Sequence, residues 1–91
     1  MSNFLKISPL DNVATALQIF SAGDQVNLVD GSHLIINEEI EFGHKFALQH
    51  INKGDKVYKY GEVIGVAIRD IEMGEHVHTH NLEGTRGRGD L

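Results

Sequence analysis

The chain has 91 residues, a formal net charge of −5 and no cysteine, and 41% of its residues are hydrophobic. This composition is typical of one small globular domain, and the lack of cysteine excludes a disulfide framework and a cysteine-ligated zinc knuckle. The acidic balance disfavours nucleic acid, which requires a basic face. No apolar stretch approaches the ~20 residues of a membrane span, and the N-terminus lacks the pattern of a signal peptide. We therefore expect a cytoplasmic protein that binds neither membrane nor nucleic acid.

The first predicted elements are one strand and one helix. Residues 4–7 alternate between apolar and polar positions, as a short strand does. Asp11 to Ile19 is the only segment that fits a short helix, with Asp11 or Asn12 as its N-cap.

Two β-hairpins are predicted further along the chain. Residues 26–29 and 33–36 flank Asp30-Gly31, which is a strong hairpin turn signal. A second pair of apolar runs, at 57–60 and 63–68, flanks Gly61-Glu62 in the same way. Short strands with a glycine turn about every ten residues predict a mostly β fold.

One pattern occurs three times, at residues 16–26, 47–57 and 67–77. Its shared form is alanine, an aliphatic residue, two variable residues, an apolar residue, two variable residues, glycine, an acid, a variable residue and valine. Glycine supplies the positive φ that a tight turn needs. Each copy therefore predicts the end of a strand, a short turn of helix-like backbone, a glycine–acid turn and a new strand. The valine, which is Val77 in the third copy, is the expected core position.

Three histidines recur at alternate positions, at 76, 78 and 80. On a strand this spacing places all three imidazoles on one face, which the repeat puts opposite the buried Val77. Same-face neighbours are ~6.8 Å apart, so His78 and His80 can share one metal ion through bonds of ~2.1 Å. His76 and His80 span twice that distance, which disfavours three ligands on one ion. The alternative is an exposed polar strand face, because a His-x-His pair alone is a weak metal signal.

His44 is the other candidate for chemistry. It lies between Gly43, which allows close backbone approach, and Lys45, which adds a positive charge suited to an anionic substrate. The alternative is a turn histidine beside a surface lysine. The acidic run at residues 38–41 is typical of a solvated turn. No nucleophile with a base and no phosphate-binding glycine loop is evident, so the residues alone do not define a complete enzyme.

The last residues form a separate segment. From residue 83 to residue 91 the chain alternates glycine with charge and offers nothing to bury. We expect a domain over residues 1–82 and a flexible Gly/Arg-rich C-terminal tail over residues 83–91. The arginines of this tail are expected to bind carboxylates of a partner chain.

Five segments are specific in combination: Asp11-Asn12-Val13-Ala14, Gly43-His44-Lys45-Phe46-Ala47-Leu48, Ile51-x-Lys53-Gly54, Lys59-Tyr60-Gly61-x-x-Ile64-Gly65 and Ile71-x-x-Gly74-Glu75-His76-Val77-His78-x-His80-Asn81. Together they resemble the N-terminal domain of the altronate/galactarate dehydratase family. The resemblance covers nearly the whole chain, to about Asn81. It implies a small SAF-type β-clip domain, related to antifreeze-like domains, with many short strands and short helical turns.

The resemblance also implies a place in a lyase. In this family the domain precedes a long catalytic region or forms a separate small subunit, and a length of 91 residues favours the small subunit. Such subunits occur in altronate dehydratase, also called altronate hydrolase, and in sulfolactate sulfo-lyase. The first eliminates water from a sugar acid to give a 2-keto-3-deoxy acid, and the second releases sulfite. In either case a large catalytic subunit is the expected partner and the isolated chain is expected to be inactive. A non-catalytic binding or assembly module is a further alternative.

Site residues follow from the same resemblance. The implied catalytic residues are His44, His78 and His80, and the implied substrate-binding residues are Lys45 and Asn81. His78 and His80 are also the implied metal ligands, for iron(II) or another divalent metal that the large subunit can also hold. His76 is the expected bystander.

Overall fold

The computed structural model describes residues 3–84, which form nine short β-strands and no helix. The strands are β1 (Phe4–Leu5), β2 (Val13–Ala16), β3 (Gln25–Asn27), β4 (His33–Ile35), β5 (Lys45–Ala47), β6 (Lys56–Lys59), β7 (Glu62–Ala67), β8 (His76–Val77) and β9 (Leu82–Gly84). The prediction of a mostly β fold is confirmed. Within the described residues no helix is long and apolar enough to cross a membrane.

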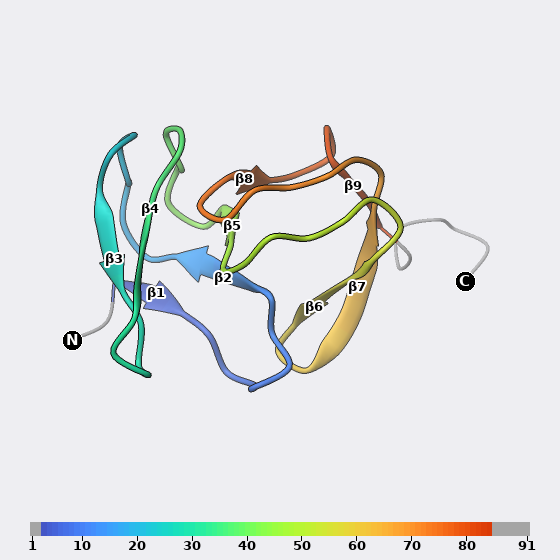
Figure 1. The fold of residues 1–91 in the computed structure, drawn as a ribbon, viewed down its shortest axis with the longest axis horizontal. Helices are drawn as coiled ribbons and strands as arrows, with labels where there is room; N and C mark the ends of the chain where they lie inside the picture. Colours follow the sequence, from blue (N-terminus) through green and yellow to red (C-terminus); the bar gives the residue numbers. More distant parts are fainter. Residues whose placement is uncertain (1–2, 85–91) are drawn as a thin grey trace.

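The strands form three antiparallel sheets. The central sheet has the order β1-β2-β5-β8, while β3 pairs with β4 and the third sheet has the order β6-β7-β9. Figure 1 shows the β3–β4 hairpin at one end of the long axis and β6, β7 and β9 at the other, with the central sheet between them. Both predicted hairpins are therefore confirmed.

The helix predicted over residues 11–19 is wrong, because Val13–Ala16 is strand β2. Three of the four side chains of β2 are buried, and the strand lies between β1 and β5 in the central sheet. A strand with neighbours on both edges and little exposed surface shows no polar alternation to identify it. Asp11 and Asn12, the predicted caps, instead use their side chains to hold the N-terminal loop and β6.

In all three predicted copies of the repeat the strand ends and the glycine turn are as expected, but bends and an isolated bridge stand in place of the predicted helix-like turn. A strand ends at the alanine of each copy and a new strand begins nine residues later. The glycines between them have φ of +94°, +92° and +85°, at Gly23, Gly54 and Gly74. A fourth copy occurs at residues 36–46, where Gly43 has φ of +85°. It was missed because Ile36 stands in place of the alanine, His44 in place of the acid and Phe46 in place of the valine.

The four copies pair in twos, and the pairs are related by a shift of 31 residues. An isolated bridge joins Phe20 to Ile40, and a second joins Ile51 to Ile71. The same shift places β3 and β4 on β6 and β7, and it also relates the two separate hydrophobic clusters. The first cluster includes Phe20 and Ile40, and the second includes Ile51 and Ile71. The domain is therefore two similar halves joined in the central sheet.

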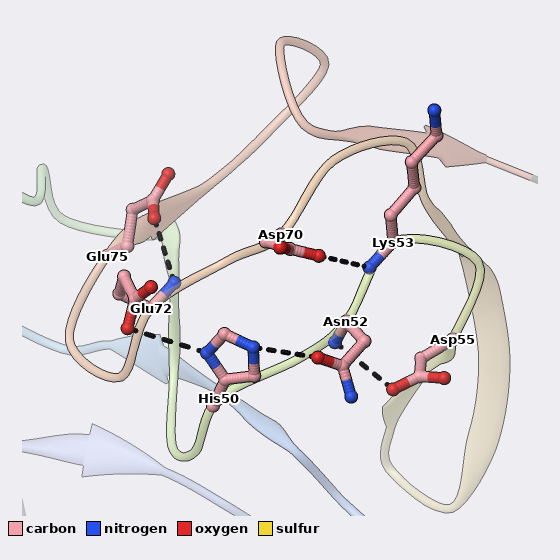
Figure 2. Close-up of polar contacts among 7 residues, drawn as sticks. All are labelled: His50, Asn52, Lys53, Asp55, Asp70, Glu72 and Glu75. Carbon is pink, nitrogen blue, oxygen red and sulfur yellow. Dashed lines mark hydrogen bonds and ion pairs between the residues drawn. The ribbon is translucent and has the colours of Figure 1, made fainter.

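The acid in each predicted copy closes its turn. Figure 2 shows two of these turns side by side: Asp55 Oδ2 accepts from the Asn52 N–H at 3.1 Å, and Glu75 Oε1 accepts from the Glu72 N–H at 2.9 Å. His50 links the two turns, because its ring nitrogens lie 2.8 Å from Asn52 Oδ1 and 3.4 Å from Glu72 Oε1. The Asn52 contact, followed by the Glu72 contact, raises the pKa of His50. His50 thus has a structural role in the described residues.

Strand structure continues beyond residue 82, where the domain was predicted to end. Glu83 and Gly84 belong to β9 and pair with Val66 and Gly65 of β7. The rest of the predicted tail, residues 85–91, lies outside the described residues, so its flexibility stays a prediction.

Candidate histidine site

Four histidines from two distant segments gather at the open edge of the central sheet. The ring centroid of His76 lies 5.1 Å from that of His44, 5.5 Å from that of His78 and 5.4 Å from that of His80. The rings of His44 and His78 are 5.2 Å apart. Since His76 takes part in three of these four contacts, the expectation that it is a bystander does not agree with the geometry.

The predicted strand through all three C-terminal histidines is only partly correct. Strand β8 ends at Val77, which is fully buried as expected, and His78, Thr79 and His80 form a turn. In that turn the carbonyl of His78 accepts from the N–H groups of Asn81 and Leu82, at 3.0 and 2.9 Å. The turn brings the imidazoles together, whereas a continuous strand would space them at ~6.8 Å.

The side chain of Asn81 holds this turn in place. Its side chain is fully buried, and its Oδ1 accepts from the His78 N–H at 2.9 Å. Its Nδ2 donates to the His76 carbonyl at 2.8 Å and to Glu75 Oε2 at 3.2 Å. Since buried polar groups need such partners, the side chain holds the backbone on both sides of Val77. These contacts make Asn81 a positioning residue, and its predicted contact with substrate stays a prediction.

His44 occupies the turn position that an acid fills in the other three copies. Its backbone N–H still donates to the Glu41 carbonyl at 2.9 Å, so the turn forms without the acid. The imidazole is then available to the neighbouring strand, and its Nδ1 lies 2.9 Å from His76 Nε2. At that distance one ring must donate and the other accept, so the two facing nitrogens share one proton. The departure from the repeat is what supplies the site with its fourth ring.

Burial and neighbouring charge shape the electrostatics of the cluster. Burial, then the nearby His44 and His80, lower the pKa of His76. Glu38, whose Oε2 accepts from the His76 N–H at 3.2 Å, raises this pKa and so acts in the opposite sense. A second acid at the rim, Glu41, has its Oε1 3.6 Å from His44 Nε2. The sequence analysis assigned both acids to a solvated turn. Their place in the fourth copy of the repeat was the signal that could have identified them.

Three of the imidazoles form a candidate metal-binding group. One ring nitrogen from each of His44, His76 and His78 lies within 4.8 Å of the others. The set differs from the predicted pair of His78 and His80, because His80 contacts the cluster through the ring of His76. The metal roles of His78 and His80 stay predictions.

The side chains of Lys45 and His44 lie in different parts of the structure. In β5 it is in register with Thr15 on one side and Val77 on the other, and its side chain points away from that of Phe46. His76, which contacts His44, is the register partner of Phe46. The structure therefore separates the two adjacent residues that the sequence analysis joined in one anion site.

Comparison with known proteins agrees with the architecture. The model of the altronate/galactarate dehydratase SAF domain matches residues 2–85. The chain belongs to this family. It is 47% identical over 78 residues to altronate dehydratase of Escherichia coli (strain K12), covering 86% of this chain and 16% of that protein. It is 42% identical over 83 residues to altronate dehydratase of Bacillus subtilis (strain 168), covering 91% of this chain and 16% of that protein.

The chain also matches a shorter relative, and this match covers most of the relative's own length. The chain is 47% identical over 53 residues to (2R)-sulfolactate sulfo-lyase subunit alpha of Paracoccus pantotrophus, covering 58% of this chain and 79% of that subunit. The chain thus spans about a sixth of the length of the two altronate dehydratases and most of the length of this subunit.

Proposed function

We propose that this chain is the small subunit of a sugar-acid dehydratase of the altronate dehydratase type. Its role is to contribute the histidine cluster to an active site completed by a larger catalytic chain. The observation that supports this most directly is the gathering of His44, His76 and His78 around one point by two separate turns. Relatives named altronate dehydratase support the reaction class.

The proposed reaction is a β-elimination. A base takes the proton on the carbon next to the carboxylate, hydroxide leaves from the following carbon with a proton from an acid, and the enol becomes a 2-keto-3-deoxy acid. Such proton transfers need an acid–base group, most often an imidazole, within hydrogen-bond reach of the substrate. His80, exposed and in contact with the ring of His76, is the imidazole we assign to proton transfer. We retain His44 and His78 as groups that contact the substrate or its metal.

The donor set suits the divalent metal that the family implies. Imidazole nitrogens bind iron(II), zinc and related ions, and three protein ligands leave positions open for substrate. Two ligands at right angles on bonds of ~2.1 Å are ~3 Å apart, which agrees with the 2.9 Å between His44 Nδ1 and His76 Nε2. His78 lies on an exposed turn, where its ring can complete the group. When bound, the metal would stabilise the negative charge that develops on the carboxylate as the proton leaves.

A larger partner is part of the proposal. The relatives named altronate dehydratase carry the matched region as 16% of their length, and the sulfo-lyase relative is named as one subunit of an enzyme. An apolar groove between β1 and the β3–β4 loop provides a surface for that partner, with Leu5, Ile7, Leu17 and Val29 among its lining residues. The exposed fraction of Val29 is 97% and that of Ile7 is 63%. Exposed apolar groups gathered in this way are typical of an interface.

The test uses the chain together with a large catalytic chain of the same family and iron(II). The expected result is a 2-keto-3-deoxy acid from altronate, measured by a colorimetric or coupled assay. We expect His78→Gln and His80→Gln to lose most of this activity, and His33→Gln, an exposed histidine on β4, to retain it. Full activity and normal metal content in both site variants would contradict the catalytic role and favour a non-catalytic assembly module.

A second candidate is the small subunit of sulfolactate sulfo-lyase. The observation that favours it is the 79% coverage of subunit alpha, which is itself a short chain. The chemistry differs only in the leaving group, because sulfite departs in place of hydroxide. Sulfite release from sulfolactate with no turnover of altronate would decide for this candidate.

A further inference from the structure

The two ring nitrogens of His44 face different partners. Its Nδ1 lies 2.9 Å from His76 Nε2, whereas its Nε2 lies 3.6 Å from Oε1 of Glu41. A neutral imidazole carries one proton, so Nδ1 offers a lone pair to a metal only when that proton is on Nε2. An ionised carboxylate can only accept hydrogen bonds, and it therefore favours the N–H over the lone pair at the nitrogen that it faces.

Glu41 holds His44 through its backbone as well as its side chain. The Glu41 carbonyl accepts from the His44 N–H at 2.9 Å, so one residue contacts both the main chain and the ring of the histidine. The separation of 3.6 Å is that of an ion pair, and it is longer than a hydrogen bond. The side chain of Glu41 is 68% exposed, so a small change in its torsion angles brings the carboxylate within hydrogen-bond distance of Nε2.

The contact reverses the direction of the side-chain hydrogen bond in the other glycine turns. In the three predicted copies of the repeat, the N–H of the first turn residue donates to the acid three residues later, at 2.8, 3.1 and 2.9 Å. In the fourth copy His44 takes the place of that acid, and the carboxylate belongs to the first turn residue, Glu41. The carboxylate therefore lies against the ring of a site histidine, where it acts on the imidazole.

A second histidine–glutamate contact has a different environment. Glu72 stands in the third copy where Glu41 stands in the fourth, and its Oε1 lies 3.4 Å from His50 Nδ1. The other nitrogen of His50 lies 2.8 Å from Asn52 Oδ1, as Figure 2 shows. Both nitrogens of His50 thus face oxygen atoms, and neither is directed at another imidazole. Only the contact of Glu41 leaves the second nitrogen of its histidine facing the cluster.

We propose that Glu41 is a positioning residue for His44, which keeps the ring proton on Nε2 and presents the lone pair of Nδ1 to a divalent metal. Histidine ligands commonly donate their other N–H to a carboxylate, which orients the ring and raises its basicity. Among the described residues, the group whose ring nitrogens lie within 4.8 Å of one another does not include Glu41, so we expect no bond from Glu41 to the metal. The metal is part of the proposed function, whereas the proton position on His44 is a property of this chain alone.

The first test measures the proton position in the metal-free 91-residue chain. Two-bond ¹H–¹⁵N NMR spectra of the imidazoles, recorded at about pH 8.5 where histidine is neutral, report which nitrogen carries the proton. We expect the proton of His44 on Nε2 in the wild type. Glu41→Gln preserves the size of the side chain, but an amide can face either an N–H or a lone pair. This variant should therefore show a mixture of the two proton positions, which a purely structural role of Glu41 would not produce.

The second test measures cobalt(II) binding by calorimetric titration and by visible absorption. Loss of a group that orients a metal ligand commonly lowers affinity 10–100-fold, and we expect about tenfold for Glu41→Gln with an unchanged absorption spectrum. Glu72→Gln, at the equivalent position of the third copy, is the matched control. Glu39→Gln removes the same charge from a nearby exposed residue and controls for the general attraction of a cation. Both controls should bind cobalt(II) as the wild type does.

Each contrary result overturns the proposal. An unchanged proton position or wild-type affinity in Glu41→Gln would refute the role of Glu41, and an equal loss of affinity in Glu39→Gln would reduce it to a general effect of charge. A changed cobalt(II) spectrum in Glu41→Gln would instead identify Glu41 as a ligand. Absence of cobalt(II) binding by the wild-type chain would refute the metal assignment.

These outcomes are distinct from those of the proposed function. If Glu41→Gln changes the proton position and the cobalt(II) affinity as expected but no sugar acid is turned over with a large catalytic chain, the proposed function fails and the role of Glu41 stands. If altronate is turned over but Glu41→Gln matches the wild type in both measurements, the role of Glu41 fails and the proposed function stands.

Discussion

Replacement of Asn81 by alanine tests whether a buried amide holds the histidine site together. The side chain is fully buried and makes three hydrogen bonds. Alanine leaves the His78 N–H and the His76 carbonyl without their partner, and each buried polar group left unpaired costs about 1–3 kcal/mol. We expect Asn81→Ala to lower the free energy of unfolding by about 3 kcal/mol, measured by urea unfolding followed by circular dichroism. That is a large share of the 5–15 kcal/mol typical of a small domain.

The same replacement should also weaken metal binding at the histidine site. Without Asn81 the turn from His78 to His80 is no longer tied to β8, so the imidazoles lose their mutual positions. Removal of groups that orient metal ligands commonly reduces metal affinity 10–100-fold. We therefore expect cobalt(II) or zinc(II) affinity, measured by calorimetric titration at a temperature where the variant is folded, to fall more than tenfold.

Asn12→Ala is the matched control. Asn12 is nearly as buried, with 8% of its surface exposed, and its amide also bridges two backbone groups, but these groups belong to β6 and not to the histidine turn. It should destabilise the chain to a similar extent and leave metal affinity unchanged. Wild-type metal affinity in folded Asn81→Ala, or an equal loss in Asn12→Ala, would refute the reasoning. If Asn81→Ala does not fold, Asn81→Asp preserves the volume and the acceptor for the His78 N–H, and should still weaken binding because it places a carboxylate against Glu75.

Three further predictions follow from the turns and the N-terminal loop. His44→Asp restores the acid of the repeat, and the new carboxylate can accept from the Glu41 N–H. We therefore expect this variant to be about 1 kcal/mol more stable in urea unfolding and to lose its metal affinity. A variant less stable than the wild type would contradict this prediction. Gly74→Ala should prevent folding or cost several kcal/mol, because its Cβ would lie 2.1 Å from a backbone carbonyl oxygen, whereas Gly23→Ala, with a similar φ but open space, should cost about 1 kcal/mol. Burial acts to raise the pKa of Asp11, but four backbone N–H groups outweigh it and hold the pKa below its usual value of 3.8. Its contribution to stability is therefore complete above pH 3.8 and is lost as the pH falls through the lower value in the folded chain, so Asp11→Asn should be less stable at pH 7 and lose less than wild type on acidification below pH 4.

The repeat made most of the fold predictable from sequence. Its glycines mark places where the chain needs positive φ, and its alanine, central apolar residue and valine lie in the two hydrophobic clusters, so strand ends and hairpins followed directly. The failure over residues 11–19 has a physical cause. Val13–Ala16 is buried in the middle of a sheet, and its side chains therefore show no alternation that distinguishes a strand from a helix.

The site was only partly predictable because its geometry depends on departures from the pattern. The alternating histidines suggested one strand face, but the amide of Asn81 turns the chain after Val77 and gathers the rings instead. Likewise His44 is recognisable as unusual only once the fourth copy of the repeat is seen, because an acid is the residue that this turn otherwise uses. The alternating spacing of the histidines carries neither fact, because the turn depends on the side-chain amide of Asn81 and the role of His44 depends on its contact with His76, 32 residues away.

The duplication also explains why the site lies at an edge. Strands β5 and β8 are antiparallel neighbours with Lys45 opposite Val77, so the start of β5, which His44 precedes, lies beside the end of β8, which His78 follows. In the central sheet β8 is the last strand within the described residues, and it is only two residues long. A short edge strand that breaks into a turn resists unspecific strand pairing. It also leaves the imidazoles open on one side, where the larger chain that we propose would cover them.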